Sequence, residues 1–138
     1  MEQCITRIPF NLNPDNKPVR GQVEIYTDGL RIVEQEEKWI PMEGIREFRC
    51  DVGVGSVTLE ISREEGDCRI CRGTMDQLAI FSAAAKRMNR FLDGAVPGED
   101  WMEYKKAVCP KCHRPYLPDS EICPKCTKKG GYLRRLWK

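Results

Sequence analysis

Histidine is nearly absent from this chain: its 138 residues include one, His113. A Ser-His-Asp or Cys-His catalytic arrangement therefore has no further support in the sequence, and no catalytic residue is predicted. No run of about 18 apolar residues occurs, so no segment is expected to span a membrane. The N-terminus, Met-Glu-Gln-Cys, lacks the basic region and apolar stretch of a secretory signal. These absences favour a soluble, non-catalytic, cytoplasmic chain.

Cysteine is abundant by contrast, with eight residues. In a cytosolic protein thiols stay reduced, and clustered cysteines usually hold a metal ion. A disulfide framework is the alternative that an even cysteine count permits. The 41% hydrophobic and 32% charged content is typical of a globular protein.

Charge divides the chain into two parts. Residues 1–104 hold 13 Lys/Arg and 19 Asp/Glu, a net charge of −6, whereas residues 105–138 hold 10 and 2, a net charge of +8. Such a split predicts two units with different tasks, the second of which meets an anionic partner.

The first ninety residues alternate short β-prone runs with turn residues. Asp28-Gly29 is a type I′ hairpin signal, because both central residues of that turn need positive φ. Val57, Leu59 and Ile61 show the strand alternation most clearly. The runs predicted as strands are Thr6–Phe10, Gly21–Tyr26, Leu30–Glu34, Lys38–Pro41, Ile45–Val52, Ser56–Ser62 and Cys68–Arg72.

Helical spacing replaces the strand period from Thr74 to Asp93. Thr74 and Gln77 have the spacing of a capping box, and Gly94 is a plausible stop. The expected apolar stripe consists of Leu78, Phe81, Ala85, Met88 and Leu92. The pattern predicts an α+β fold, a small antiparallel barrel or sheet of about seven strands closed by a C-terminal helix.

Cys68 and Cys71 have the spacing of a metal or redox pair but lie in a predicted strand. Strand positions i and i+3 point to opposite faces, so Cys68 is expected to share the core face with Ile70 and Cys71 to point away. A thiol redox protein that uses this pair is the least favoured function. Cys4 and Cys50 are expected to be ordinary buried or half-buried thiols.

The strongest motif is a duplicated clip, Cys109-x₂-Cys112 and Cys123-x₂-Cys126, with ten residues between the clips. Two such turns supply four thiolates for tetrahedral Zn²⁺. Some twenty residues cannot bury a sufficient core, so zinc is expected to hold this segment together. Four cysteines leave no open coordination position, which predicts a structural site. His113 could replace a ligand but is better explained as a surface residue.

Basic residues surround the clips, which raises the alternative of a free-standing zinc-ribbon adaptor for nucleic acid or a transcription partner. Tyr116 and Tyr132 are the few aromatics available for base stacking, and no groove-reading helix is evident. The basic residues concerned are Lys111, Arg114, Lys125, Lys128 and Lys129.

The last residues form a basic amphipathic segment. Leu133, Leu136 and Trp137 have helical spacing, with arginines between them. A basic, tryptophan-containing stretch of this kind is typical of the cytoplasmic approach to a membrane span. The membrane-proximal basic residues are Arg134, Arg135 and Lys138. An ordinary frayed basic tail is the alternative.

CPKCHRPYLPDSEICPKC followed by LRRLWK resembles the N-terminal extension of bacterial ABC exporters, in which a "CPKCGRPLPPGS…CPKC" ribbon precedes an "LRRLWKL…KPY" elbow. GTMDQLAIFSAAAKRMNRFLDG is similar to the helix before that ribbon. His113 stands where glycine is usual, and the Cys68/Cys71 pair is a further departure. The resemblance implies a pleckstrin-homology-like (PH-like) first domain. No Walker motif is present, so any ATPase would lie in a longer parent protein.

The sequence thus predicts a PH-like domain over residues 1–94, a linker over 95–107, a Cys₄ zinc ribbon over 108–130 and a membrane-proximal segment over 131–138. The resemblance implies a non-catalytic regulatory or scaffolding region of a transporter at the inner face of the cell membrane. Its partners would be the rest of the transporter, protein partners or an anionic membrane surface. Headgroup binding by the first domain is disfavoured, because its first hairpin loop offers only Lys17 and Arg20.

Overall fold

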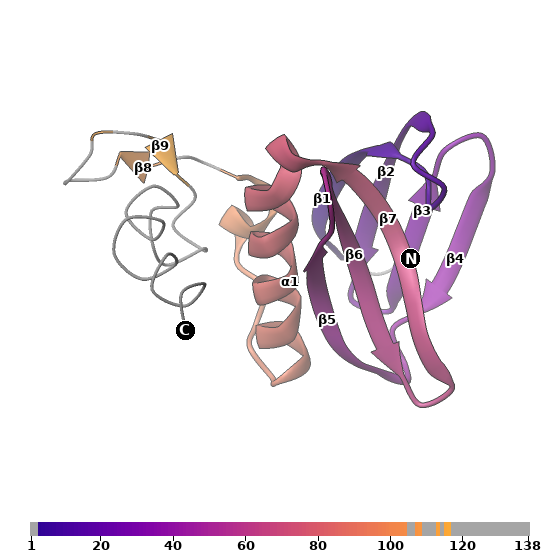
Figure 1. The fold of residues 1–138 in the computed structure, drawn as a ribbon. Helices are drawn as coiled ribbons and strands as arrows, with labels where there is room; N and C mark the ends of the chain where they lie inside the picture. Colours follow the sequence, from indigo (N-terminus) through magenta and orange to yellow (C-terminus); the bar gives the residue numbers. More distant parts are fainter. Residues whose placement is uncertain (1–2, 105–106, 109–112, 114, 117–138) are drawn as a thin grey trace, which may run out of the picture.

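The computed structural model describes residues 3–104, 107–108, 113 and 115–116. Seven antiparallel strands form an open sheet in the order β4-β3-β2-β1-β7-β6-β5, and one α-helix follows β7 (Figure 1). The strands are β1 (Cys4–Leu12), β2 (Pro18–Tyr26), β3 (Gly29–Val33), β4 (Glu37–Pro41), β5 (Ile45–Val52), β6 (Ser56–Arg63) and β7 (Gly66–Thr74). The predicted sheet with a C-terminal helix is confirmed, and the sheet is open, with β4 and β5 at its edges.

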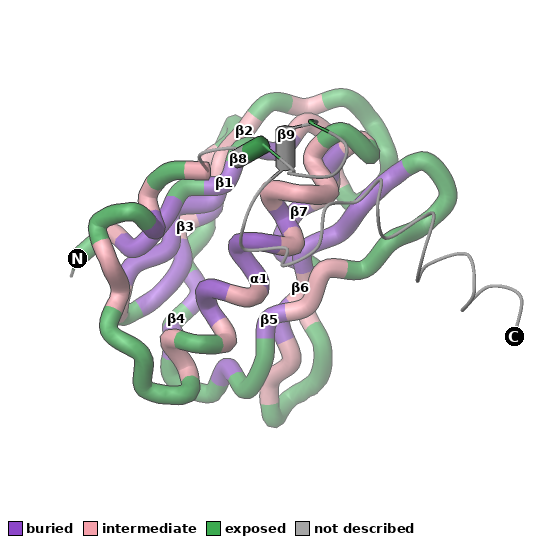
Figure 2. The backbone as a smooth tube through the Cα atoms, turned by 90° about the vertical axis from the view of Figure 1, so that its left-hand side faces the viewer, coloured by how far each residue is buried: buried purple, intermediate pink, exposed green. Residues whose placement is uncertain are grey.

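Two meanders make up the sheet. β1 to β4 pair in succession, as do β5 to β7. The halves meet where β1 runs beside β7, with Leu12 opposite Arg72. The inner face is apolar, and its buried side chains include Ile8, Val23 and Leu59. Buried positions follow the strands and the helix, whereas the hairpin turns are exposed (Figure 2).

The helix begins later than predicted. β7 continues to Thr74, a 3-10 turn η1 (Met75–Gln77) follows, and α1 spans Leu78–Leu92. The predicted capping box is wrong, because Thr74 makes no side-chain cap hydrogen bond and Gln77 Nε2 donates instead to the carbonyl of Pro9, at 2.8 Å. The Gln77 side chain therefore bonds a carbonyl of β1 and does not cap the N-terminus of the helix.

One face of α1 packs on the inner face of the sheet, mainly against β5 and β6. Phe81, Ala85 and Met88 of the predicted stripe are buried, and Leu78 and Leu92 pack at its ends. Burial of Phe81 or Met88 contributes about 1.5–3 kcal/mol each to folding. The side-chain amide of Asn89 bonds both the N–H and the carbonyl of Phe48, so the helix also covers the free edge of β5.

The β2–β3 turn differs from its prediction by one residue. Thr27 and Asp28 form the turn, and Gly29 is already paired with Tyr26. Gly29 is required for another reason: a Cβ there would lie 2.4 Å from the Trp39 ring. The aromatic ring on the edge strand therefore packs directly on backbone.

Part of the predicted linker packs on the sheet. The 3-10 turn η2 (Glu99–Met102) lies against β1, and Trp101 is buried. Arg87, itself buried in α1, donates to the Trp101 carbonyl at 2.6 Å and lies 4.4 Å from the Tyr104 ring. The Tyr104 and Thr6 hydroxyls are hydrogen-bonded at 2.6 Å. Residues 3–104 therefore form one packed body, named here the sheet–helix unit.

Candidate functional site

The four predicted zinc ligands, Cys109, Cys112, Cys123 and Cys126, lie outside the described residues. Two short strands are described on either side of the first clip in sequence. β8 (Ala107–Val108) pairs antiparallel with β9 (Pro115–Tyr116). The sequence between these strands comprises residues 109–114 and contains the first Cys-x₂-Cys.

His113 is described within that interval, and it is exposed with φ of 59°. This left-handed conformation is uncommon for a residue with a Cβ, although histidine, asparagine and aspartate tolerate it better than most. A residue in the left-handed region thus directly follows Cys112 in the sequence.

Within the described part of the chain, no group of three or more His, Cys, Asp or Glu residues could hold a metal ion. No helix among those residues is long and apolar enough to cross a membrane. The predicted membrane-proximal residues Arg134, Arg135 and Lys138 lie outside them.

The prediction that Cys68 and Cys71 point to opposite faces is wrong. Cys68 pairs with Ile61 and Cys71 with Leu59, which lie on the same inner face of β6. Ile70 is the extra residue of a β-bulge, which restores the inward direction at Cys71. Cys71 is 2% exposed and Cys68 is half-buried. The bulge therefore turns both thiols toward the core.

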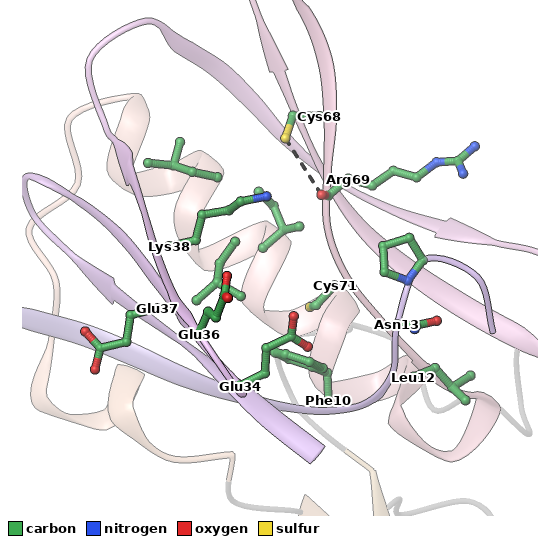
Figure 3. A pocket seen from close by; sticks show the side chains of 14 residues that line it. Phe10, Leu12, Asn13, Glu34, Glu36, Glu37, Lys38, Cys68, Arg69 and Cys71 are labelled. Atoms are coloured by element: carbon green, nitrogen blue, oxygen red, sulfur yellow. Dashed lines mark hydrogen bonds between the residues drawn. The ribbon is translucent and has the colours of Figure 1, made fainter. Parts of the chain in front are cut away.

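Both thiols line a cavity of about 230 Å³, named here the hairpin pocket, between the β3–β4 hairpin and β7 (Figure 3). Glu34, Glu36 and Lys38 extend their charged groups around its mouth, whereas Glu37 points away. The apolar part of its lining is Phe10, Leu12, Pro14, Ile32, Ile40 and Ile70.

The core-side thiols are poorly suited to nucleophilic chemistry. Burial, with a smaller effect from Asp51, raises the pKa of Cys50 to about 11. Burial, followed by the neighbouring Cys50, raises the pKa of Cys71 further. Thiol reactivity requires the thiolate, so both groups are unreactive at neutral pH.

The outer face of the first meander carries a buried carboxylate that the sequence did not reveal. Glu24, 5% exposed, accepts hydrogen bonds from Arg31 Nε at 2.6 Å, Gln22 Nε2 at 2.8 Å and Tyr26 Oη at 3.0 Å. Burial alone would raise the pKa of Glu24, but the hydrogen bonds and charges of Arg31, Tyr26 and Arg7 outweigh it and the pKa is lowered. This cluster joins β1, β2 and β3 and has no opening toward a ligand cavity among those described.

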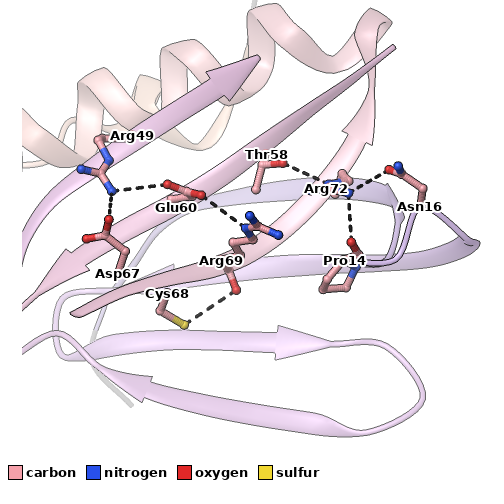
Figure 4. A network of polar contacts seen from close by, with 9 residues as sticks. All are labelled: Pro14, Asn16, Arg49, Thr58, Glu60, Asp67, Cys68, Arg69 and Arg72. Carbon is pink, nitrogen blue, oxygen red and sulfur yellow. Dashed lines mark hydrogen bonds and ion pairs between the residues drawn. The ribbon is translucent and has the colours of Figure 1, made fainter. Parts of the chain in front are cut away.

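A second polar network covers the outer face of β5 to β7 (Figure 4). Arg49 donates to Asp67 at 2.6 Å and to Glu60 at 3.3 Å. Arg72 donates to the Pro14 carbonyl at 2.9 Å and to Asn16 Oδ1 at 3.0 Å, both in the β1–β2 loop. Arg72 thereby holds that loop in place, and its guanidinium is engaged by protein groups.

Lys17 is exposed in this loop, and Arg20 is exposed near the start of β2. Comparison with known proteins adds no assignment, since no family model, curated protein or solved structure matches the chain significantly.

Proposed function

We propose that this chain is the non-catalytic, cytoplasmic N-terminal region of an ABC exporter-like membrane transporter. A PH-like domain would be followed by a structural Cys₄ zinc ribbon and a basic membrane-proximal segment. The observation that carries the proposal is the duplicated CPKC clip followed by LRRLWK.

The sheet order supports the PH-like part. About seven antiparallel strands followed by one helix are expected of that architecture, and the sheet and α1 have this order. The β1–β2 loop, which presents basic residues in headgroup-binding domains, is held here by Arg72 and offers Lys17, with Arg20 nearby at the start of β2. A protein-contact or scaffolding role therefore suits the sheet–helix unit better than lipid recognition.

The β8–β9 pairing and the conformation of His113 support the zinc ribbon. A metal-binding knuckle needs a tight turn, and a left-handed residue after the second cysteine lets backbone N–H groups point toward the thiolates. His113 has that conformation directly after Cys112. We assign Cys109, Cys112, Cys123 and Cys126 to one structural Zn²⁺, with apparent binding on the order of 10–16 kcal/mol for comparable small sites.

The basic residues Arg134, Arg135 and Lys138 would face the anionic inner leaflet, at about 1 kcal/mol for each charge near such a surface. The raised pKa of the buried Cys71 thiol weighs against the redox alternative, which uses Cys68 and Cys71. The nucleic-acid adaptor keeps one supporting feature, the net charge of +8 over residues 105–138.

Vesicle flotation of the zinc-loaded full chain tests the proposal. We expect flotation with anionic but not with neutral vesicles, and its loss in R134Q/R135Q/K138Q. The matched control K17Q/R20Q removes basic residues from the sheet–helix unit and should float normally. Equal flotation on both vesicle types would contradict the membrane role. Salt-sensitive binding to nucleic acid, without vesicle binding, would favour the adaptor.

A further inference from the structure

The hairpin pocket has an apolar floor and an acidic mouth, a combination that favours an amphipathic cation as its ligand. Its floor is apolar, formed by side chains such as Phe10, Ile32 and Ile40. Its mouth carries the carboxylates of Glu34 and Glu36, which form no ion pair within the described residues. An amphipathic cation satisfies both parts, because an alkyl stem covers apolar surface while its charged head meets a carboxylate.

Two basic residues, Arg69 and Lys38, line the pocket, and only Lys38 directs its charge toward the cavity. Arg69 is paired with Glu60 at 3.5 Å on the outer face. Lys38 alone points its ammonium toward the cavity. Glu37, which points away, is 3.8 Å from Arg31. With a net charge of −6 over residues 1–104, the surroundings favour a cation over a phosphate or another anion.

Both cysteines of β7 lie in the lining of the pocket. The Cys71 thiol lies in its lining, 2% exposed, and makes no hydrogen bond within the part of the chain that the structure describes. Cys68, by contrast, donates weakly to the Arg69 carbonyl at 3.7 Å. A guest side chain would pack against the half-buried Cys68.

The sequence contains a segment with the matching chemistry. Residues 131–138 interleave Leu133 and Leu136 with Arg134 and Arg135. Arginine suits this mouth, because its guanidinium pairs with carboxylates through two parallel hydrogen bonds. Because this segment belongs to the same chain, its effective concentration at the pocket is on the order of millimolar.

We propose that the hairpin pocket binds the chain's own basic segment, residues 131–138, with the arginines at Glu34 and Glu36. The inference rests on the proposed function, which places this segment at the membrane surface. It names the segment as the binding partner of the sheet–helix unit. Docking would hold the unit beside the membrane-proximal segment, and anionic lipid would compete for the same arginines.

Cys68 is a native reporter for this contact, because it lines the pocket and is half-buried. The rate of maleimide labelling at Cys68 is measured by peptide mass mapping on the zinc-loaded full chain. Labelling at the deeply buried Cys71 reports unfolding. We expect R134E/R135E to speed Cys68 labelling about three- to fivefold, the effect of roughly one exposed ion pair. High salt should do the same to the wild type, since charge interactions are then screened beyond about 3 Å.

Exchanging the charges of the pocket and of the basic segment tests whether the two contact each other directly. E34K/E36K should also expose Cys68, and combining it with R134E/R135E should restore protection. E43K/E47K makes the same charge change outside the pocket lining and should label like the wild type. If E34K/E36K unfolds, as rapid Cys71 labelling would show, R134E/R135E alone decides.

Equal Cys68 rates in the wild type and R134E/R135E would overturn the inference. Protection that increases with protein concentration would also overturn it, in favour of contact between two copies. Flotation of the same variants separates the two proposals. If R134E/R135E floats like the wild type, the membrane role fails, whereas unchanged Cys68 labelling refutes only the docking.

Discussion

The side chain of Asn89 contacts Phe48 as a neighbouring strand would. Its Oδ1 accepts from the Phe48 N–H at 2.7 Å, and its Nδ2 donates to the Phe48 carbonyl at 2.8 Å. Phe48 lies on the edge strand β5 and is 1% exposed. An amide on a helix therefore completes the pairing of a sheet edge, which would otherwise be open to another chain.

Asn89→Ala should destabilise the sheet–helix unit by about 1–3 kcal/mol, because it leaves the Phe48 N–H and carbonyl without partners under the helix. Urea unfolding measures the loss, and hydrogen exchange at the Phe48 amide localises it. Asn89→Asp keeps the acceptor and removes the donor, so it should fall between the alanine variant and the wild type. Unchanged exchange at Phe48 would show that the two bonds contribute nothing.

Glu24→Gln should lower the free energy of unfolding at neutral pH by about 1–3 kcal/mol, because the ion pair with Arg31 is lost and the Tyr26 hydroxyl no longer donates to a charged acceptor. The folded-state pKa of Glu24 is lowered, so its contribution is present above the ordinary value of about 4.3. The contribution is lost as pH falls through the lower folded-state pKa. Urea unfolding in neutral and acidic buffers should show the wild-type advantage disappear over that range.

Glu47→Gln is the matched control for Glu24→Gln. The Glu47 side chain is 54% exposed and lies 4.0 Å from Arg49, so the substitution should have little effect. A control that lost as much stability as Glu24→Gln would point to general charge repulsion in place of the cluster.

Alkylation of Cys50 by iodoacetamide should keep accelerating up to a pH of about 11, because burial and Asp51 raise its pKa to that value. An exposed thiol levels off nearer its ordinary pKa of about 8.5. The contribution of Cys50 to stability is fully present below that ordinary value and is lost as pH rises toward 11. Asp51→Asn should shift the profile slightly downward. A plateau near the ordinary value would disprove the raised pKa.

Cys112→Ser should abolish stoichiometric zinc binding and leave the sheet–helix unit folded, since its buried core is formed by residues of that unit. Zinc content and hydrogen exchange measure the two effects separately. Cys4→Ser, outside the proposed ligand set, should retain one zinc per chain. A single cooperative transition that loses zinc and sheet together would refute independent units.

Short β-prone runs bounded by turn residues were sufficient to predict each strand of the sheet, and apolar alternation was clear in some of them, such as Val57, Leu59 and Ile61. The β-bulge at Ile70 was not predictable, since it arises from the pairing of β7 with β6. The sequence left open whether Trp101 docks on a neighbouring unit or is exposed, because its contact with Arg87 joins two different elements. The burial of Glu24 was not predictable, because a charged residue on the outer face of a strand is expected to be exposed. Arg7 and Arg31, which cover it, lie on the neighbouring strands β1 and β3.

The zinc site was predicted from the sequence, whereas the structure does not describe its ligands. Its ligands were predicted from spacing alone, because Cys-x₂-Cys pairs need no tertiary information beyond a turn. They lie outside the described residues, so the site remains a prediction with His113 and the β8–β9 pairing as its described neighbours.

The hydrogen bond between Thr6 and Tyr104 brings the beginning and the end of the sheet–helix unit together at β1. A unit with adjacent ends can be carried within a longer polypeptide as a side loop, without separating the sequences on either side. It should also tolerate circular permutation, with a short linker between its ends and new termini cut between β4 and β5, where the two meanders are joined by a single connection.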